Sequence, residues 1–313
     1  MATTVTTSAL SLPANLAQGL IDKVETGSAV AALSASKPLL FGNTQVVTFT
    51  KHPRAEFVEE GAAKAPADVE FGTVTAVPHK AQVTVRFDEE VLWADEDRKV
   101  GVFQAIADAG ATALSRALDL GVFHRINPST GAVMNGWTNY LTATTKTVTD
   151  TGDADADIEK AIGLVLNDGE GYDVNGIALS KPEAFKLATT RDKQGHPLYP
   201  ELGYGTNVTA FKGTKASVTT TVNAPEATTA TGVEAIVGDY AGGIYWGIQK
   251  NLPLELISYG DPDGLGDLKR HNQVAYRLEI LYAWHVDQAR FAVVKAASHD
   301  PGQVTVVADD GKH

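Results

Sequence analysis

A few serine, lysine and aspartate residues stand at spacings that could support chemistry. Ser34 and Lys37 form an S-x-x-K pattern, in which a lysine activates a serine for acyl transfer. Neither S-D-N nor K-T-G, the partner motifs of such enzymes, follows later in the chain. Because a four-residue pattern often occurs by chance, we interpret this one as coincidental.

Two runs of aspartates are candidates for calcium binding. Residues 153–157 read D-A-D-A-D, like the start of an EF-hand loop, but the glycine and glutamate of that loop are missing at its sixth and twelfth positions. Asp261, Asp263 and Asp267 form the second run, which could hold calcium weakly. We expect helix capping from the first run and a plain turn from the second, because Asp-Pro and Asp-Gly themselves form turns.

The other common site motifs are absent. The chain contains no cysteine, which excludes thiolate nucleophiles and cysteine-bound zinc. Its eight histidines include no pair four residues apart that could grip a metal from one helix face. We therefore assign no catalytic residue, no cofactor-binding residue and no metal ligand, and we predict that the protein is not an enzyme.

Length and charge restrict the class of protein further. The chain has 313 residues, long enough for two domains, and 43% of them are hydrophobic. The formal net charge of -12 disfavours sequence-specific binding to nucleic acid, although a container can enclose DNA without binding it tightly. No secretory signal and no run of about 18 apolar residues is present, so we expect a protein made in the cytosol with no membrane partner.

The first third of the chain has two parts that look unable to build a core alone. Residues 1–44 are rich in Ser, Thr and Ala and predict an arm with one short helix. In residues 45–87, strand patterns at Gln45–Thr50 and Ala81–Phe87 flank the polar segment 59–68. This arrangement predicts a long hairpin whose tip reaches away from the body.

The strongest helix signal spans residues 95–125. Acidic residues at its start and the basic residues 124–125 at its end suit the helix dipole. Leu114 and Leu118 belong to an i, i+3, i+4 apolar stripe, and Gly110 thins the packing face. A helix of about 30 residues is about 45 Å long, which indicates a structural spine.

The rest of the chain alternates between helix and strand patterns. We predict helices at 157–167 and 182–190, and strands at 176–179, 216–222, 233–237, 244–248 and 254–258. Residues 273–294 contain an alternating apolar run, from Val274 to Val286, that predicts a long, bent core strand. Residues 298–313 read as a polar tail.

Several local sequences occur together in an order typical of one family. They are Leu179-Ser180-Lys181-Pro182, Asp192 to Tyr199, Phe211-Lys212-Gly213, Val237-Gly238-Asp239-Tyr240 before Ile244 to Ile248, and Arg277-Leu278-Glu279-Ile280 through Ala289 to Val294. With the arm, hairpin and spine helix, the chain resembles the Hong-Kong-97-type major capsid proteins of tailed double-stranded DNA bacteriophages. The resemblance covers roughly residues 10 to 297.

The resemblance implies an α+β capsid fold with an N-terminal arm, an extended β-hairpin loop, a peripheral domain and an axial α/β domain. The implied boundaries are 1–44 for the arm, 45–87 for the hairpin loop, 88–150 for the peripheral domain with its spine helix, 151–260 for the axial domain, 261–297 for the peripheral return strand and 298–313 for the tail. The implied function is self-assembly, as hexamers and pentamers, into an icosahedral shell around double-stranded DNA. The implied partners are other copies of the chain, a portal protein and, in some members, separate scaffolding or decoration proteins.

Two features of some family members are not expected here. No room for a scaffolding domain exists before Leu12, so we expect that scaffolding is a separate protein or unnecessary, or alternatively that this chain is a mature product with a new start. Lys64 is the only lysine near the predicted hairpin tip, and no asparagine or carboxylate partner for a covalent crosslink can be assigned.

Other functions stay open at the level of sequence. An encapsulin-like compartment would share the fold but enclose an enzyme cargo instead of a genome. A soluble α/β enzyme built on residues 155–260 is a less favoured alternative. A tail-tube protein fits poorly, because its mainly β architecture has no place for the spine helix.

Overall fold

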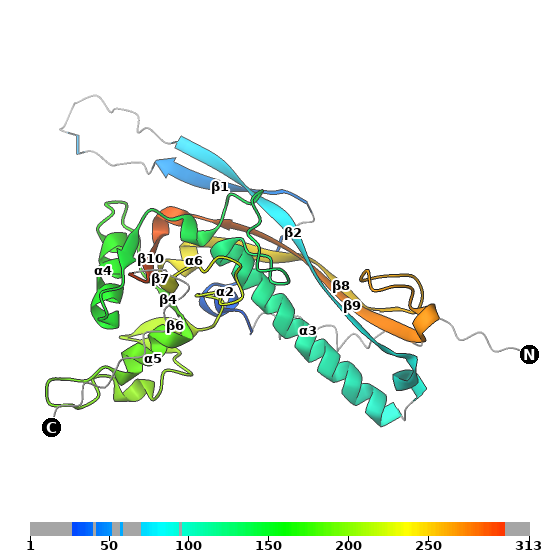
Figure 1. Cartoon of the computed structure of the whole chain (residues 1–313). Coiled ribbons are helices and arrows are strands. Elements are labelled where there is room, and N and C mark those ends of the chain that lie inside the picture. The colour runs from blue at the N-terminus through cyan, green and yellow to red at the C-terminus, as the bar shows by residue number, and fades with distance from the viewer. Residues whose placement is uncertain (1–26, 40–41, 52–56, 59–69, 94–95, 298–313) are drawn as a thin grey trace, which may run out of the picture. The chain divides into compact units, whose positions relative to one another are not determined.

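The computed structural model describes residues 27–39, 42–51, 57–58, 70–93 and 96–297 (Figure 1). The chain divides into two compact units. Unit 1 comprises Met1–Leu118 and Ile244–Val286, and unit 2 comprises Asp119–Gly243 and Asp287–His313. The predicted arm before residue 27, the hairpin tip at 59–68 and the tail after residue 297 lie outside the described residues.

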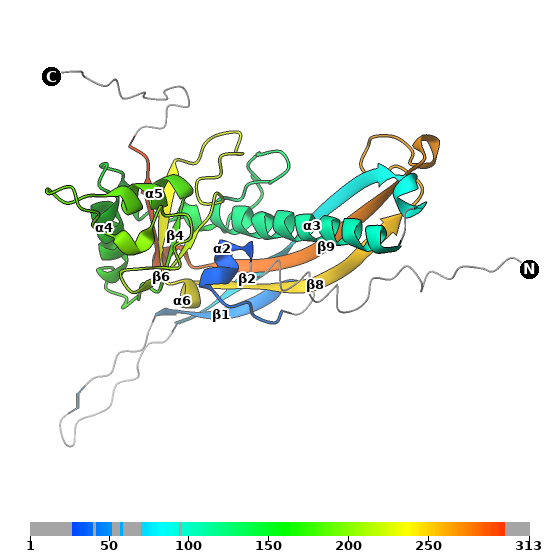
Figure 2. The ribbon, with the colours of Figure 1, turned by 90° about the horizontal axis from the view of Figure 1, so that it is seen from below.

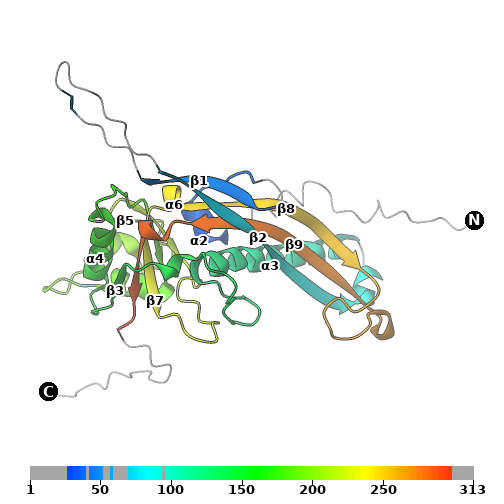
Figure 3. The ribbon, with the colours of Figure 1, turned by 90° about the horizontal axis from the view of Figure 1, so that it is seen from above.

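Unit 1 contains an antiparallel sheet of four strands, which Figure 3 shows side by side. The strands are β1 (Thr44–Lys51), β2 (Glu70–Asp88), β9 (Gln273–Val286) and β8 (Ile244–Ile257), in that order across the sheet. Strand β2 changes its partner along its length: residues 70–76 pair with β1, and residues 77–88 pair with β9. Two strands therefore pair on either side of residues 59–68, but the partner of β1 is the segment 70–76, whereas the predicted strand Ala81–Phe87 pairs with β9.

The alternating apolar run of β9 supplies the core of unit 1. Every second residue from Val274 to Val286 is buried. Helix α3 (Glu96–His124), whose 29 residues extend about 44 Å, packs along β9 with its first part (Figure 2). A Cβ atom on Gly110 would lie 2.2 Å from Leu278 Cδ1, so this glycine allows the close approach of helix and strand. The predicted spine helix and its thinned face are confirmed.

The segment after the short helix α2 (Ala29–Leu33) lies against the edge strand β8. Ser28 caps the helix by accepting a hydrogen bond from the Ala31 N–H. The Lys37 N–H donates to the Trp246 carbonyl over 2.9 Å. A Cβ atom on Gly247 would fall 2.0 Å from the Lys37 carbonyl oxygen, so only glycine permits this contact. Two 3₁₀ helices, η2 (Glu89–Trp93) and η5 (Lys269–His271), complete unit 1.

Unit 2 is built around a six-stranded mixed sheet. Its strands, in spatial order, are β3 (Thr147–Thr149), β10 (Phe291–Lys295), β7 (Val233–Gly238), β4 (Gly176–Leu179), β6 (Thr214–Val218) and β5 (Ala210–Phe211). Its helices are α4 (Ala154–Leu166), α5 (Lys181–Thr189) and α6 (Tyr240–Gly243), with 3₁₀ helices η3 (Leu141–Ala143), η4 (Pro200–Leu202) and η6 (Gln288–Arg290). Buried side chains of α4 and α5 pack on the sheet and form a single apolar cluster with it.

Two strand predictions are corrected by the structure. The segments predicted as separate strands at 244–248 and 254–258 form one strand, β8, whose register shifts twice. Pro253 lies in this strand, and a proline is tolerated there because β8 is at the sheet edge and irregular. Conversely, the run 273–294 is two strands in two different sheets. Asp287 ends β9, because its side chain accepts a hydrogen bond from the Ala289 N–H and starts η6.

The fold is thus a mixed α+β fold. The boundaries predicted for arm, hairpin loop, peripheral and axial domains stay a prediction, because they describe places in an assembled shell. The two compact units describe contacts within one chain.

Candidate functional site

The predicted S-x-x-K pair is structural. Ser34 ends α2, where its hydroxyl donates to the Val30 carbonyl over 2.7 Å and accepts from the Trp246 indole N–H over 2.9 Å. The Lys37 ammonium lies 4.7 Å from the centre of the Tyr245 ring. Both side chains are therefore engaged in packing. These contacts support the interpretation that the S-x-x-K pattern is coincidental.

The acidic turn at 261–267 holds a guanidinium. Arg86 Nε donates to Asp263 Oδ2 over 2.9 Å, and its Nη2 contacts the other oxygen of the same carboxylate. Arg86 also donates to the Gly266 carbonyl over 2.9 Å and to Gln273 Oε1 over 3.2 Å. Hydrogen bonding to Arg86 holds the pKa of Asp263 below its ordinary value. The positive charge that calcium would bring is supplied by Arg86, so the plain-turn interpretation fits.

The carboxylates of residues 153–157 point to different partners. Asp153 caps α4 by accepting from the Ala156 N–H, as expected. Asp155 accepts from the Tyr199 hydroxyl and the Lys212 ammonium, both over 2.5 Å. The buried Asp157 accepts from Thr151 and Lys160. These three carboxylates do not converge on one point and cannot coordinate a common ion.

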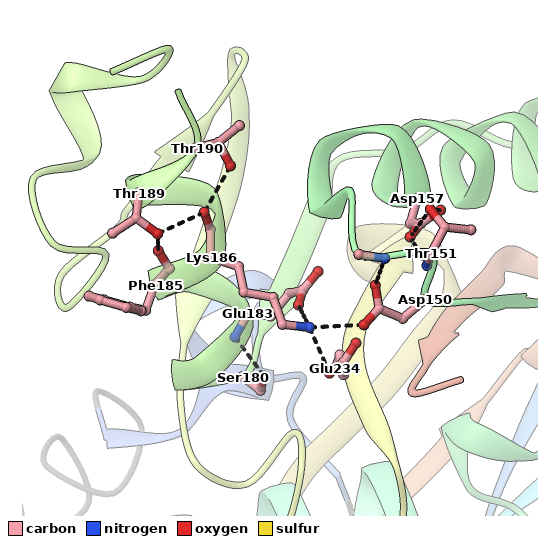
Figure 4. Close-up of polar contacts among 11 residues, drawn as sticks. Asp150, Thr151, Asp157, Ser180, Glu183, Phe185, Lys186, Thr189, Thr190 and Glu234 are labelled. Carbon is pink, nitrogen blue, oxygen red and sulfur yellow. Dashed lines mark hydrogen bonds and ion pairs between the residues drawn. The ribbon is translucent and has the colours of Figure 1, made fainter. Parts of the chain in front are cut away.

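One group of four ionisable side chains in unit 2 was not found from the sequence. Figure 4 shows Lys186 of α5 reaching toward three carboxylates. Its Nζ lies 2.9 Å from Asp150 Oδ2, 3.0 Å from Glu183 Oε2 and 3.0 Å from Glu234 Oε1. We call these four residues the Lys186 cluster. The cluster ties α5 to β7 and to the segment after β3.

The Lys186 cluster is largely buried and contains three carboxyl groups but a single ammonium group. Burial raises the pKa of Glu234 to about 7, although Lys186 opposes this effect. Burial also raises the pKa of Glu183, whose side chain is fully buried, although the Lys186 ammonium opposes this effect. For Asp150, burial is outweighed by hydrogen bonds from the Gly152 N–H and Lys186, which hold its pKa below the ordinary value.

The charge balance explains these shifts. Three ionised carboxylates around one ammonium leave two uncompensated negative charges, which a poorly solvated site disfavours. The group therefore titrates as a unit, and Glu234 takes up a proton near neutral pH. The only signal of the cluster in the sequence is the i, i+3 spacing of Glu183 and Lys186, since the other two members lie far along the chain.

The described residues contain no group of three or more His, Cys, Asp or Glu side chains placed to hold a metal ion. Among the same residues, no helix is both long and apolar enough to cross a membrane. What does stand out is exposed apolar surface on loops. Phe57, between β1 and β2, is fully exposed, and Tyr204, Tyr259 and Leu265 are each more than 70% exposed. Single exposed apolar residues occur on most protein surfaces, so these positions alone assign no function.

Comparison with known proteins identifies the family. The sequence profile of the phage capsid family matches residues 9–296. The chain belongs to the phage capsid family.

Individual family members are similar over most of their length. The probable major capsid protein gp17 of Mycobacterium phage D29 is 25% identical over 252 residues, which are 75% of this chain and 74% of that protein. A solved chain of Mycobacterium phage Ogopogo is 44% identical, has a TM-score of 0.76, and is matched over 86% of this chain and 92% of its own length. For a chain of Gordonia phage Cozz the identity is 32%, the TM-score 0.74 and the coverage 87% of both chains.

Family membership confirms the Hong-Kong-97-type resemblance and the prediction of a structural protein. The chain is a component of the virion capsid of a tailed phage, a shell protein and not an enzyme. The functional surfaces of a capsid protein are its contacts with other copies. Such a protein needs no group of catalytic side chains that converge on one point, and none is found among the described residues.

Proposed function

We propose that the chain assembles as hexamers and pentamers into the icosahedral shell that encloses the double-stranded DNA of a tailed phage. Residues 1–44 and 45–87 act as an arm and a hairpin loop that interlock neighbouring copies. Residues 151–260 form the axial domain, and residues 88–150 with 261–297 form the peripheral domain. The similarity to the chain of Mycobacterium phage Ogopogo, at 44% identity over most of both chains, carries this proposal.

The pairing of β2 supports an interlocking role for the hairpin. Among the described residues, its segment 70–76 pairs with β1 and with no other strand, so β1 and this half of β2 form a two-stranded ribbon within unit 1. A two-stranded ribbon is marginally stable in water without a surface to pack on. A second copy of the chain would provide that surface.

An exposed aromatic residue in the connection between β1 and β2 supports the same role. The Phe57 side chain is fully exposed in the single chain, and burying a phenylalanine contributes about 1.5–3 kcal/mol. Because every copy in a shell would bury its own Phe57, a modest gain in each contact is multiplied over the whole particle. Many weak contacts of this kind suit a shell that must also avoid trapping misassembled forms.

The net charge supports enclosure without tight binding of the genome. A chain with a formal net charge of -12 repels phosphate backbones at long range, so packaged DNA would not be immobilised on the wall. A portal protein, and separate scaffolding or decoration proteins, are further partners in this proposal. The alternative of a compartment for enzyme cargo has no comparable support, because the similar proteins named above come from phages.

A substitution at Phe57 tests the proposal. Phe57→Ser should leave the unassembled chain folded but lower the yield and thermal stability of particles, measured by electron microscopy and light scattering. Thr75→Ser, at an exposed position of β2 within the ribbon, is the matched control and should assemble normally. Particles of Phe57→Ser with unchanged yield and melting temperature would contradict the interlocking role of the hairpin loop.

A further inference from the structure

A positively charged pocket lies in unit 2, where helix α3 ends. Its volume is about 230 Å³, several times the roughly 30 Å³ that a water molecule occupies in the liquid. Arg125 and Lys295 line it together with the hydroxyl-bearing residues Thr142, Thr229 and Thr231, and none of its lining residues is acidic. In a chain with a net charge of -12, such a concentration of positive charge requires an explanation.

The two cations of the pocket have no carboxylate partner among the described residues. Arg125 Nη1 donates to the Trp137 carbonyl over 3.0 Å, and the guanidinium stacks over the Tyr140 ring at 4.6 Å from its centre. These contacts hold the guanidinium in place and leave Nε and Nη2 available. The Lys295 ammonium makes no ion pair with a described carboxylate, and its charge helps to lower the pKa of His124, an effect that Glu226 opposes.

The backbone of Arg125 has a conformation that non-glycine residues rarely adopt. Arg125 follows the last residue of α3 with a φ of 54°, the left-handed conformation in which helices commonly end on glycine. A non-glycine residue pays about 1–2 kcal/mol for that conformation. The side chain of Arg125 lines the pocket from this position.

His124 lines the pocket without adding charge. Its Nε2 lies 2.8 Å from the Val222 carbonyl and 3.1 Å from the Thr221 carbonyl, so Nε2 carries the hydrogen. Burial lowers the pKa of His124 to about 4, and the ring is neutral at physiological pH. The sequence suggested a charged residue at the helix end, but Arg125 alone fills that role. The positive charge of the pocket comes from Arg125 and Lys295.

We propose that this pocket binds a phosphate-type oxyanion, which accepts hydrogen bonds from the guanidinium of Arg125, the ammonium of Lys295 and the hydroxyl of Thr229. Guanidinium and ammonium groups are the usual protein partners of phosphate oxygens, and such charge-assisted bonds are about twice as strong as neutral ones. The anion is either free phosphate or a phosphate group of a polynucleotide backbone. Because it is held by side chains of unit 2 alone, the proposal does not depend on how the shell assembles.

Two variants remove the cations independently. Arg125→Gly deletes the guanidinium and places glycine at the position where the backbone favours it, so the fold should be maintained. Lys295→Gln deletes the second charge at the end of β10. Lys193→Ala, which removes an exposed lysine of the same unit, is the control for net charge. Arg125→Lys keeps the charge and guards against a purely structural effect of the glycine.

Binding is measured on the unassembled full-length chain at fixed ionic strength. Calorimetry with inorganic phosphate and fluorescence anisotropy with a labelled DNA oligonucleotide distinguish the two sources of the anion. We expect binding of at least one of the two probes, weakened about tenfold or more by Arg125→Gly and by Lys295→Gln and unchanged by Lys193→Ala. If only phosphate binding is lost in the variants, the ligand is the free anion; if oligonucleotide binding is lost, it is the backbone. No binding of either probe, or binding unaffected by both variants, would overturn the proposal.

Discussion

Glu234 makes unit 2 sensitive to pH in a direction that can be worked out from the Lys186 cluster. A carboxyl group with a pKa of about 7 in the folded chain, against an ordinary value of 4.5, binds its proton more tightly when folded. Its favourable contribution is therefore complete below pH 4.5 and is lost as the pH rises toward and through 7. The difference between the two values corresponds to roughly 3 kcal/mol, as an upper limit for this one group. Glu183 acts in the same direction.

Glu234→Gln removes the titration while keeping an oxygen for Lys186. Near pH 5, where Glu234 is protonated, the variant and the parent chain should have similar stability. Near pH 8.5 the variant should be more stable by up to about 3 kcal/mol, because the parent must accommodate an additional buried negative charge. Asp150 and Lys186 do not mask the titration of Glu234 between pH 5 and 8.5. The pKa of Asp150 is lowered and lies below this pH range, and the pKa of Lys186 is raised and lies above it.

The assay must report on unit 2 alone, since a chain with two units does not unfold in a single step. Urea unfolding of the dispersed chain, followed by hydrogen exchange of peptides from β4 and β7, meets that need. Glu170→Gln, which neutralises an exposed glutamate outside the cluster, is the control and should keep the pH dependence of the parent. Parallel stability curves for the parent and Glu234→Gln from pH 5 to 8.5 would refute the reasoning.

Two further predictions concern unit 1. Gly110→Ala should destabilise the α3–β9 contact by about 1–3 kcal/mol, because the added Cβ would overlap Leu278. Gly101→Ala in the same helix is the control: its added Cβ meets no atom, so this variant should be neutral or stabilising when the two are compared by urea unfolding. Arg86→Lys should speed hydrogen exchange in the loop 258–272, since a lysine cannot make the two-pronged contact with Asp263, and added calcium should not slow the exchange in the parent chain. An unchanged loop in the variant, or calcium-dependent protection in the parent, would show that Arg86 does not hold the turn.

The elements with a strong local period could be predicted from the sequence. The stripe with Leu114 and Leu118 marked α3 to within a residue at each end, and the alternation from Val274 to Val286 marked β9. Both signals arise within one element, where burial imposes the period of the backbone on the side chains. The exit from β9 was missed because Asp287 ends the strand through a cap, which interrupts an apolar pattern that continues into β10.

The polar groups could not be predicted in the same way, because their members come together only in the fold. Asp150, Glu183 and Glu234 lie on three different elements, and nothing in the neighbourhood of Glu234 indicates that Lys186 will face it. The partner of the acidic turn, Arg86, is likewise about 175 residues away. The turn itself was interpreted correctly from Asp-Pro and Asp-Gly, since turn formation is a local property.

Electron cryomicroscopy of particles formed by the purified full-length chain tests the central claim most directly. A shell subunit should give closed icosahedral particles whose surface resolves into hexamers and pentamers of this chain. A chain that stays monomeric in size-exclusion chromatography and carries an enzymatic activity abolished by one polar substitution would contradict the account.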